Sequence, residues 1–315
     1  MFARRAGVLF LVSAVLFGGT FVAAKAGLAH IPPLLFVAVR FDIGALVLAV
    51  FAAVHLSRAE LRPRTVGDVV GIFATGVIVI GLTNALLFVG QQYVTSGVAA
   101  VIFSLNPILT PVFAALLLSE ERLSVRGFAG MGLGLLGVVL VANPDSAALL
   151  GGGLGIPLLF AAAVASALGA VVIRRSGATL SSTARTVWGV PLAALLSHGL
   201  SYAAGEPVVG LSLPPVAIAA LLYVGVFSGA VSNLAYYELF DDLGATRANL
   251  LFYFVPIVSA VGGWVLLGET LSVLAVVGFA LIFAGFLLVT GLPPDSFRDL
   301  RRGVRDRLVS GGSRM

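Results

Sequence analysis

The stretch from Phe103 to Val125, FSLNPILTPVFAALLLSEERLSV, decides the fold because the chain contains a second version of it. The second version runs from Phe252 to Val273 and reads FYFVPIVSAVGGWVLLGETLSV. Pro107 in the first version corresponds to Pro256 in the second, 149 residues later. An internal repeat of this kind bounds the architecture before any single motif is considered.

The correspondence continues on both sides of this stretch. The further pairs are Asn84 with Asn233, Glu121 with Glu269, Gly130 with Gly278, and Gly137 with Gly285. We therefore divide the chain into a first repeat at residues 1–144, a second repeat at residues 149–292 and a tail at residues 293–315.

The composition predicts an integral membrane protein. Of the 315 residues, 59% are hydrophobic and 10% are charged, and the mean hydropathy is +1.10. A soluble domain carries roughly 25% charged residues. Ten apolar runs approach the length of about 20 residues that a helix needs to cross the hydrocarbon core. They lie near residues 7–29, 33–55, 66–90, 95–118, 124–142, 153–173, 183–204, 215–239, 245–267 and 272–292.

We therefore expect an all-α membrane protein with ten transmembrane helices arranged as two inverted five-helix repeats. The inversion follows because five helices per repeat is an odd number. Arginines cluster before the first run, in alternate connections and in the tail, whereas the remaining connections contain no Lys or Arg. This asymmetry predicts that both termini lie in the cytoplasm. We expect the protein to reside in the plasma membrane. We interpret the first run as an uncleaved helix rather than a signal peptide, because nine further runs follow it.

Two asparagines are candidates for contact with a substrate. Asn84 and Asn233 occupy equivalent positions in the two repeats, and an amide at hydrocarbon depth needs a hydrogen-bonding partner. Inverted repeats would place both amides toward a shared axis, where they bind substrate or hold the bundle together. Tyr237, close to Asn233, is a further candidate.

The two repeated prolines predict kinks near the middle of the fourth and ninth runs. A proline removes a backbone donor and frees the carbonyl one turn earlier. Transporters place such breaks where substrate binds or where the two halves bend. Asn106 beside Pro107, and Tyr253 close to Pro256, are the side chains expected to meet the freed groups or the substrate.

Ionisable side chains at membrane depth call for a wet cavity or a partner. Arg40 is predicted either to attract an anionic group such as a carboxylate or to form a structural pair, and Trp188 is a further pathway candidate. Lys25 is expected to reach the outer interface. Asp42 is a weak candidate proton site, whereas a lone histidine such as His198 is expected to be a packed residue.

Two repeated acids are interpreted as structural. Glu121 and Glu269 precede the fifth and tenth runs, where a carboxylate would cap free amides and complement the helix dipole. No cofactor, metal or nucleic acid is expected. The chain has no cysteine, and it lacks a GxxxxGK[ST] phosphate loop, an HExxH metal motif and clustered aspartates within its apolar runs. The basic tail is expected to lie on membrane lipids.

The sequence resembles the EamA type of the drug/metabolite transporter superfamily over residues 7–292. The resemblance rests on FGGTFVAAKAG at Phe17–Gly27, on VAVRFDIGALVL around Arg40, and on the two blocks that run from proline to glutamate. It implies a carrier with a central cavity that moves small polar metabolites such as amino acids, often outward. Phe17 stands where the family usually has tryptophan.

A secondary transporter working by alternating access is therefore the expected function. A lipid flippase or a channel-like permease on the same fold is the alternative. The coupled species, a proton or a counter-substrate, is left open. A homodimer through Gly130 and Gly134 is also left open, because these glycines would serve equally well inside the bundle.

Overall fold

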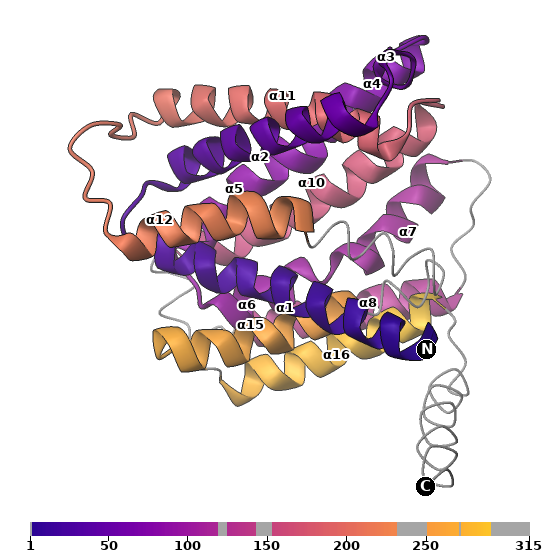
Figure 1. The fold of residues 1–315 in the computed structure, drawn as a ribbon. Coiled ribbons are helices and arrows are strands. Elements are labelled where there is room, and N and C mark those ends of the chain that lie inside the picture. The colour runs from indigo at the N-terminus through magenta and orange to yellow at the C-terminus, as the bar shows by residue number, and fades with distance from the viewer. Residues whose placement is uncertain (1, 119–124, 143–152, 232–250, 271, 291–315) are drawn as a thin grey trace, which may run out of the picture.

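In a computed structural model, the described residues are 2–118, 125–142, 153–231, 251–270 and 272–290. They are almost entirely helical (Figure 1), and each of the ten expected apolar runs contains helix. The elements are α1 (Phe2–Leu28), α2 (Pro33–His55), α3 (Arg58–Leu61), α4 (Val66–Phe73), η1 (Ala74–Leu82), α5 (Thr83–Gln91), α6 (Ser96–Phe103), α7 (Asn106–Leu117), α8 (Val125–Ala142), α10 (Gly155–Arg175), α11 (Ser182–Ala203), α12 (Pro215–Leu222), η2 (Tyr223–Val231), α15 (Leu251–Leu267) and α16 (Val273–Thr290).

Five segments are long and apolar enough to cross a membrane: Val8–Leu28, Pro33–His55, Val66–Gln91, Ser96–Leu117 and Gly155–Arg175. Four shorter apolar helices lie at Val125–Leu140, Pro215–Phe227, Phe254–Leu267 and Val273–Leu288. Helix α11 has 22 residues but a more polar sequence. The prediction of an all-α membrane protein is therefore confirmed for the described residues, whereas the count of ten spans stays a prediction.

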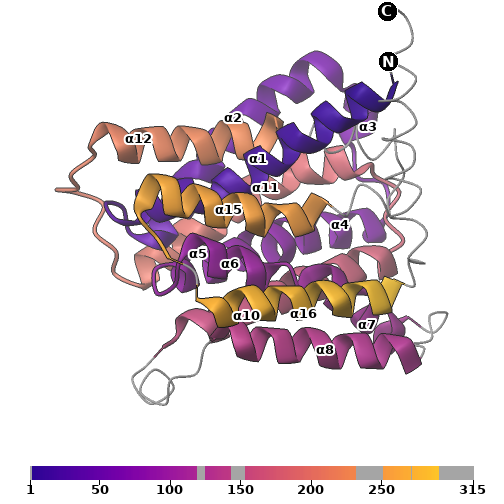
Figure 2. The same cartoon turned by 90° about the horizontal axis from the view of Figure 1, so that it is seen from below.

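The helices lie side by side with their long axes roughly aligned (Figures 1 and 2). The connections at one end of the bundle carry Arg58, Arg62, Arg64, Arg174 and Arg175, and we name this end the arginine-rich face. The connections around residues 91–95, 204–214 and 268–270 form the opposite, arginine-poor face.

Helices α8 and α16 form a close pair at one edge of the bundle (Figure 2). A Cβ atom added at Gly137 would lie 2.5 Å from the carbonyl oxygen of Gly278, and one added at Gly285 would lie 2.5 Å from that of Gly130. The repeat relates these two contacts, because Gly130 corresponds to Gly278 and Gly137 to Gly285. The repeated glycines therefore pack the two halves against each other inside one chain.

Two π-helical segments occupy equivalent positions in the two repeats. Segment η1 spans residues 74–82 and segment η2 spans residues 223–231, so their bounds are 149 residues apart. A π-helix widens the turn and often occurs at a functional site. The apolar pattern predicted ordinary helix here, and the repeat in the structure shows that the widened turn belongs to both halves.

The two repeated prolines differ in their effect. Helix α6 ends at Phe103 and α7 begins at Asn106, so the fourth run is interrupted just before Pro107. Pro256 instead lies inside the continuous helix α15. Side chains favour the break in the first repeat: the Ser104 hydroxyl donates to the carbonyl of Val101 at 2.6 Å, and Asn106 opens the next helix.

Candidate substrate cavity

A cavity of about 420 Å³ lies between the two repeats. Its lining comes from α1, α2, η1, α5, α6, α10, α11, η2 and α15. Its volume falls within the range of small-molecule sites, roughly 300–1,000 Å³. The walls are mainly apolar and include the phenyl rings of Phe17, Phe21, Phe41, Phe88, Phe103 and Phe252.

Arg40 is the cationic side chain among the lining residues. One guanidinium nitrogen, Nη2, donates to Asn84 Oδ1 at 3.1 Å. The guanidinium carbon lies 4.5 Å from the ring centre of Phe41 and 4.8 Å from that of Phe88, as in cation–π contacts. Within the described part of the chain no carboxylate pairs with Arg40.

One face of α5 supplies several of the lining residues. Asn84, Phe88 and Gln91 recur at spacings of four and three, which places them on one side of a helix. The Asn84 amide nitrogen donates to the carbonyl of Ile80 at 2.7 Å, so its oxygen is oriented toward Arg40. The side-chain oxygen of Gln91 is buried and has no partner in the described structure. This face of α5 therefore holds Arg40 of α2 in place through Asn84, while the side chain of Gln91 is fully buried at the end of α5.

Asn106 contacts a lining residue of α10 without lining the cavity itself. Its amide nitrogen donates to the hydroxyl of Ser166, which lines the cavity, and its side-chain oxygen accepts from the Thr110 hydroxyl at 3.0 Å. Asn106 thus meets a polar side chain, as expected near the helix break, but it is not among the lining residues. Ser166 and Thr20 are lining residues that the repeat did not indicate, because glycine or phenylalanine occupies their equivalent positions.

The other predicted pathway residues fall elsewhere. The indole nitrogen of Trp188 donates to the carbonyl of Leu61 at 2.8 Å at the arginine-rich face, away from the cavity lining. Phe17, at the position that the family usually fills with tryptophan, does line the cavity, and its ring lies 5.9 Å from that of Phe252. Asn233, Tyr237, Glu121 and the side chain of Tyr253 lie outside the described residues.

The arginine-poor end of the cavity is closed by contacts between α1 and the end of α5. The ammonium of Lys25 donates to the carbonyls of Gln91, Gln92 and Val94 at 2.8–3.1 Å. The side chain of Gln91 donates in turn to the carbonyl of Phe21. Lys25 therefore satisfies the free carbonyls at a helix end, and its charge is used for structure rather than to attract a substrate.

Carboxylates of the second repeat cap helices of the first. Glu206 accepts from the amides of Leu34 and Leu35 at 3.1 and 2.7 Å, at the start of α2. Glu269 accepts from the amide of Ser96 at 2.9 Å, at the start of α6. The prediction that Glu269 caps the helix that follows it is therefore corrected: it is a helix cap, but for a helix of the other repeat.

At the arginine-rich face, a carboxylate of the first repeat binds backbone amides of the second repeat. Asp68 at the start of α4 is fully buried and accepts from the amides of Thr179 and Leu180 at 2.6 and 2.8 Å. Those two residues directly precede α11, the helix that corresponds to α2 in the repeat. Glu206 and Glu269 thus bind free amides at helix starts, and Asp68 binds amides of the turn before α11, so carboxylates hold the two repeats together at both faces.

A helical membrane bundle made of two related halves around an internal cavity defines a class of membrane transporters. The chain belongs to the EamA-like transporter family, whose model matches residues 4–143 and again residues 153–291. The resemblance inferred from the repeated motifs is thereby confirmed.

Similar proteins carry transporter names. An uncharacterized transporter of Archaeoglobus fulgidus is 26% identical over 283 residues, which cover 90% of this chain and 97% of the relative. A protein of Chlamydia trachomatis serovar L2 named S-adenosylmethionine/S-adenosylhomocysteine transporter is 27% identical over 287 residues, which cover 87% of this chain and 86% of the relative. A crystal structure that is 22% identical matches with a TM-score of 0.62 and covers 92% of this chain and 99% of that one, so it shares the fold.

Proposed function

We propose that the protein is a secondary transporter that moves small polar metabolites bearing a carboxylate, amino acids or related compounds, through the cavity between its repeats. Arg40 carries the proposal. It is held in the cavity wall by Asn84 and two phenyl rings, without a carboxylate partner in the described residues. A guanidinium suits a carboxylate because both are planar and form two parallel hydrogen bonds.

The rest of the cavity fits the remainder of such a molecule. The phenyl rings accept an apolar side chain. The names of the chlamydial relative's substrates point in the same direction, because both compounds carry an α-amino acid group. The proposed substrates therefore share an α-amino acid group and differ in their side chains.

Transport would proceed by alternating access in a plasma membrane that ten spans cross, with both termini in the cytoplasm. In this proposal the arginine-poor face is external, and the structure represents a state closed at that face by Lys25, Glu206 and Glu269. The cavity extends toward the arginine-rich face as far as Leu48 and Thr186. Export is the expected direction.

Purified protein in proteoliposomes tests the proposal by flux of labelled amino acids, compared with the corresponding amines that lack the carboxylate. Arg40→Met is expected to reduce flux of the acids roughly 10- to 150-fold, the equivalent of about 1.5–3 kcal/mol for a hydrogen bond to a charged group. Arg58→Met is the matched control, since Arg58 lies in an exposed connection. Equal flux of acids and amines, or scrambling of labelled lipid without solute flux, would refute the proposal.

A further inference from the structure

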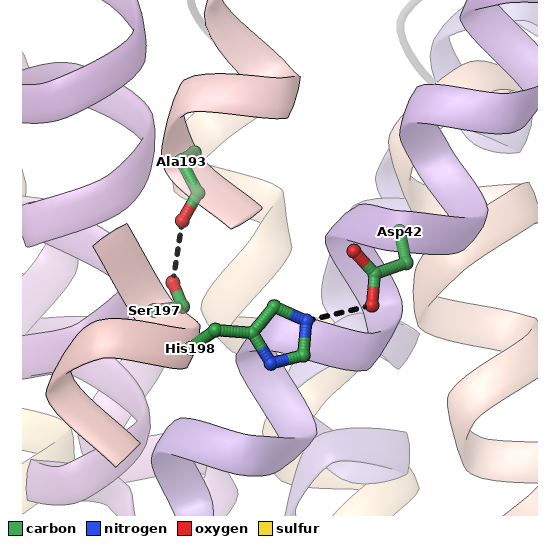
Figure 3. Close-up of polar contacts among 4 residues, drawn as sticks. All are labelled: Asp42, Ala193, Ser197 and His198. Atoms are coloured by element: carbon green, nitrogen blue, oxygen red, sulfur yellow. Dashed lines mark hydrogen bonds and ion pairs between the residues drawn. The ribbon is translucent and has the colours of Figure 1, made fainter. Parts of the chain in front are cut away.

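An acid and a histidine from different repeats meet in the seam between α2 and α11. His198 Nε2 and Asp42 Oδ2 are 2.8 Å apart, and the imidazole points across the seam toward α2 (Figure 3). The neighbouring hydroxyl of Ser197 donates back to the carbonyl of Ala193 in its own helix, so it takes no part in the pair. The histidine that the sequence indicated as a packed residue is therefore half of an ionisable pair.

The pair lies at membrane depth on the outer surface of the bundle. Asp42 is nine residues into α2, about 14 Å from its start, and His198 is five residues before the end of α11, about 8 Å away. The side chain of His198 is 45% exposed and that of Asp42 is 51% exposed. Around them the surface is apolar, with Leu46 and Leu195 exposed one turn away. Lipid chains rather than water therefore surround the pair in a membrane.

The repeat provides no second copy of this pair. Positions equivalent to Asp42 and His198 are Pro191 and Ala49, which lie on the same seam toward the arginine-rich face. Because α2 and α11 correspond to each other, an inverted repeat gives the seam two equivalent ends. One end carries titratable groups and the other carries none at these positions, so the seam distinguishes the two faces of the membrane.

Other charged and titratable groups on the neighbouring elements have partners of their own. Arg40 on α2 binds Asn84, Glu206 caps α2, and Tyr223 at the start of η2 donates to α1. Asp68 and Arg185 bind backbone groups at the arginine-rich end of the seam. Within the described residues the second carboxylate oxygen of Asp42 and the second ring nitrogen of His198 have no partner.

We propose that Asp42 and His198 form a proton-binding site that couples closure of the arginine-poor end of the α2–α11 seam to the uptake of one proton. The site rests on the proposed function, because it supplies the coupling ion for alternating access. It explains why two ionisable groups are kept at a depth where each alone would be costly.

The proton balance follows from the surroundings of the pair. In the closed seam a net charge is unfavourable, so carboxylate and imidazole together hold one proton, and the pair is neutral. When the helices separate and water enters, a free imidazole gives up its proton above about pH 6.5, while a free carboxylate stays ionised above about pH 4. Opening at a pH at which a free imidazole is neutral therefore releases one proton, and closing binds one.

Distance measurements between two spin labels test this directly, because the chain has no cysteine to remove. Labels at His30→Cys and Tyr202→Cys report on the arginine-poor ends of α2 and α11, where both residues are exposed. The ratio of closed to open states is expected to rise as pH falls from 8 to 6, by at most about tenfold per pH unit, the slope for one proton.

Two variants of the pair decide the origin of that response. Asp42→Asn keeps a hydrogen-bonding group of the same size but carries no charge for a proton to balance, so the rise of the closed state with falling pH should disappear; the double variant Asp42→Asn/His198→Gln, whose pair has no titratable group, should lack it as well. Ser197→Ala is the matched control on α11 and should keep it. The proposal would be overturned if the distance between the labels did not change with pH, or if the Asp42→Asn chain kept the pH-dependent change in the ratio of closed to open states. No substrate is needed, so this result is independent of Arg40-dependent flux.

Discussion

The contact between α8 and α16 predicts the effect of adding one methyl group to Gly137. A Cβ atom there would lie 2.5 Å from the carbonyl oxygen of Gly278, 2.7 Å from Cγ1 of Ile282 and 3.0 Å from its backbone nitrogen. Two of these atoms belong to the backbone of α16, so a side-chain rotation cannot relieve the clash. Gly137→Ala must push the two helices apart locally.

The magnitude follows from two opposing terms. Overpacking of this kind costs about 1–3 kcal/mol. Replacing glycine by alanine in a helix contributes about 0.5–1 kcal/mol in the other direction. Gly132 lies on the same helix, is exposed, and has no described atom within 4 Å of its Cβ position. Gly132→Ala should therefore gain only the helix stabilisation of about 0.5–1 kcal/mol. The difference between the unfolding free energies of the two variants then gives the cost of the clash, about 1–3 kcal/mol.

Thermal unfolding of both variants in the same detergent measures this difference. Gly137→Ala should have the lower Tm, and Gly132→Ala should match or slightly exceed the native chain. Equal Tm values for the two variants would refute the reasoning, since they would mean that α8 and α16 do not pack through these glycines. A change in oligomeric state with Gly137→Ala but not with Gly132→Ala would instead assign the glycine face to a homodimer.

Two further substitutions test other contacts between the repeats. Asp68→Ala should lower Tm by several degrees because the backbone amides of Thr179 and Leu180 lose their acceptor, whereas Glu60→Ala, in an exposed local cap, should leave Tm nearly unchanged. Gly19→Ala should destabilise by about 1–3 kcal/mol, because its Cβ would overlap the hydroxyl of Tyr223; in a Tyr223→Phe background most of that cost should vanish, as a double-mutant cycle of unfolding free energies would show.

The carboxylates that cap helices across the two repeats suggest how the proposed alternating access could proceed. The cap of α2 by Glu206 and that of α6 by Glu269 lie at the arginine-poor face, and the contact of Asp68 with the start of α11 lies at the other. Each contact satisfies backbone amides that would otherwise need water. Opening one face can therefore exchange a carboxylate for water at a helix start without leaving a buried group unpaired.

The sequence by itself determined the class of fold. Apolar runs of spanning length have no soluble alternative, and a repeat offset of 149 residues relates Pro107 to Pro256 and η1 to η2 alike. Arg40 and Asn84 were recognisable as site candidates because polar groups at membrane depth are costly, and the structure brings these two together at 3.1 Å.

Tertiary structure alone decided the partners. Asp42 and His198 are 156 residues apart and meet only because α2 and α11 pack side by side at one particular rotation. Glu269 caps α6 rather than its own helix, and Trp188 bonds outside the cavity, for the same reason. Periodicity fixes which residues share a helix face, but the neighbour of that face depends on how every helix packs, and no local pattern in the chain records that choice.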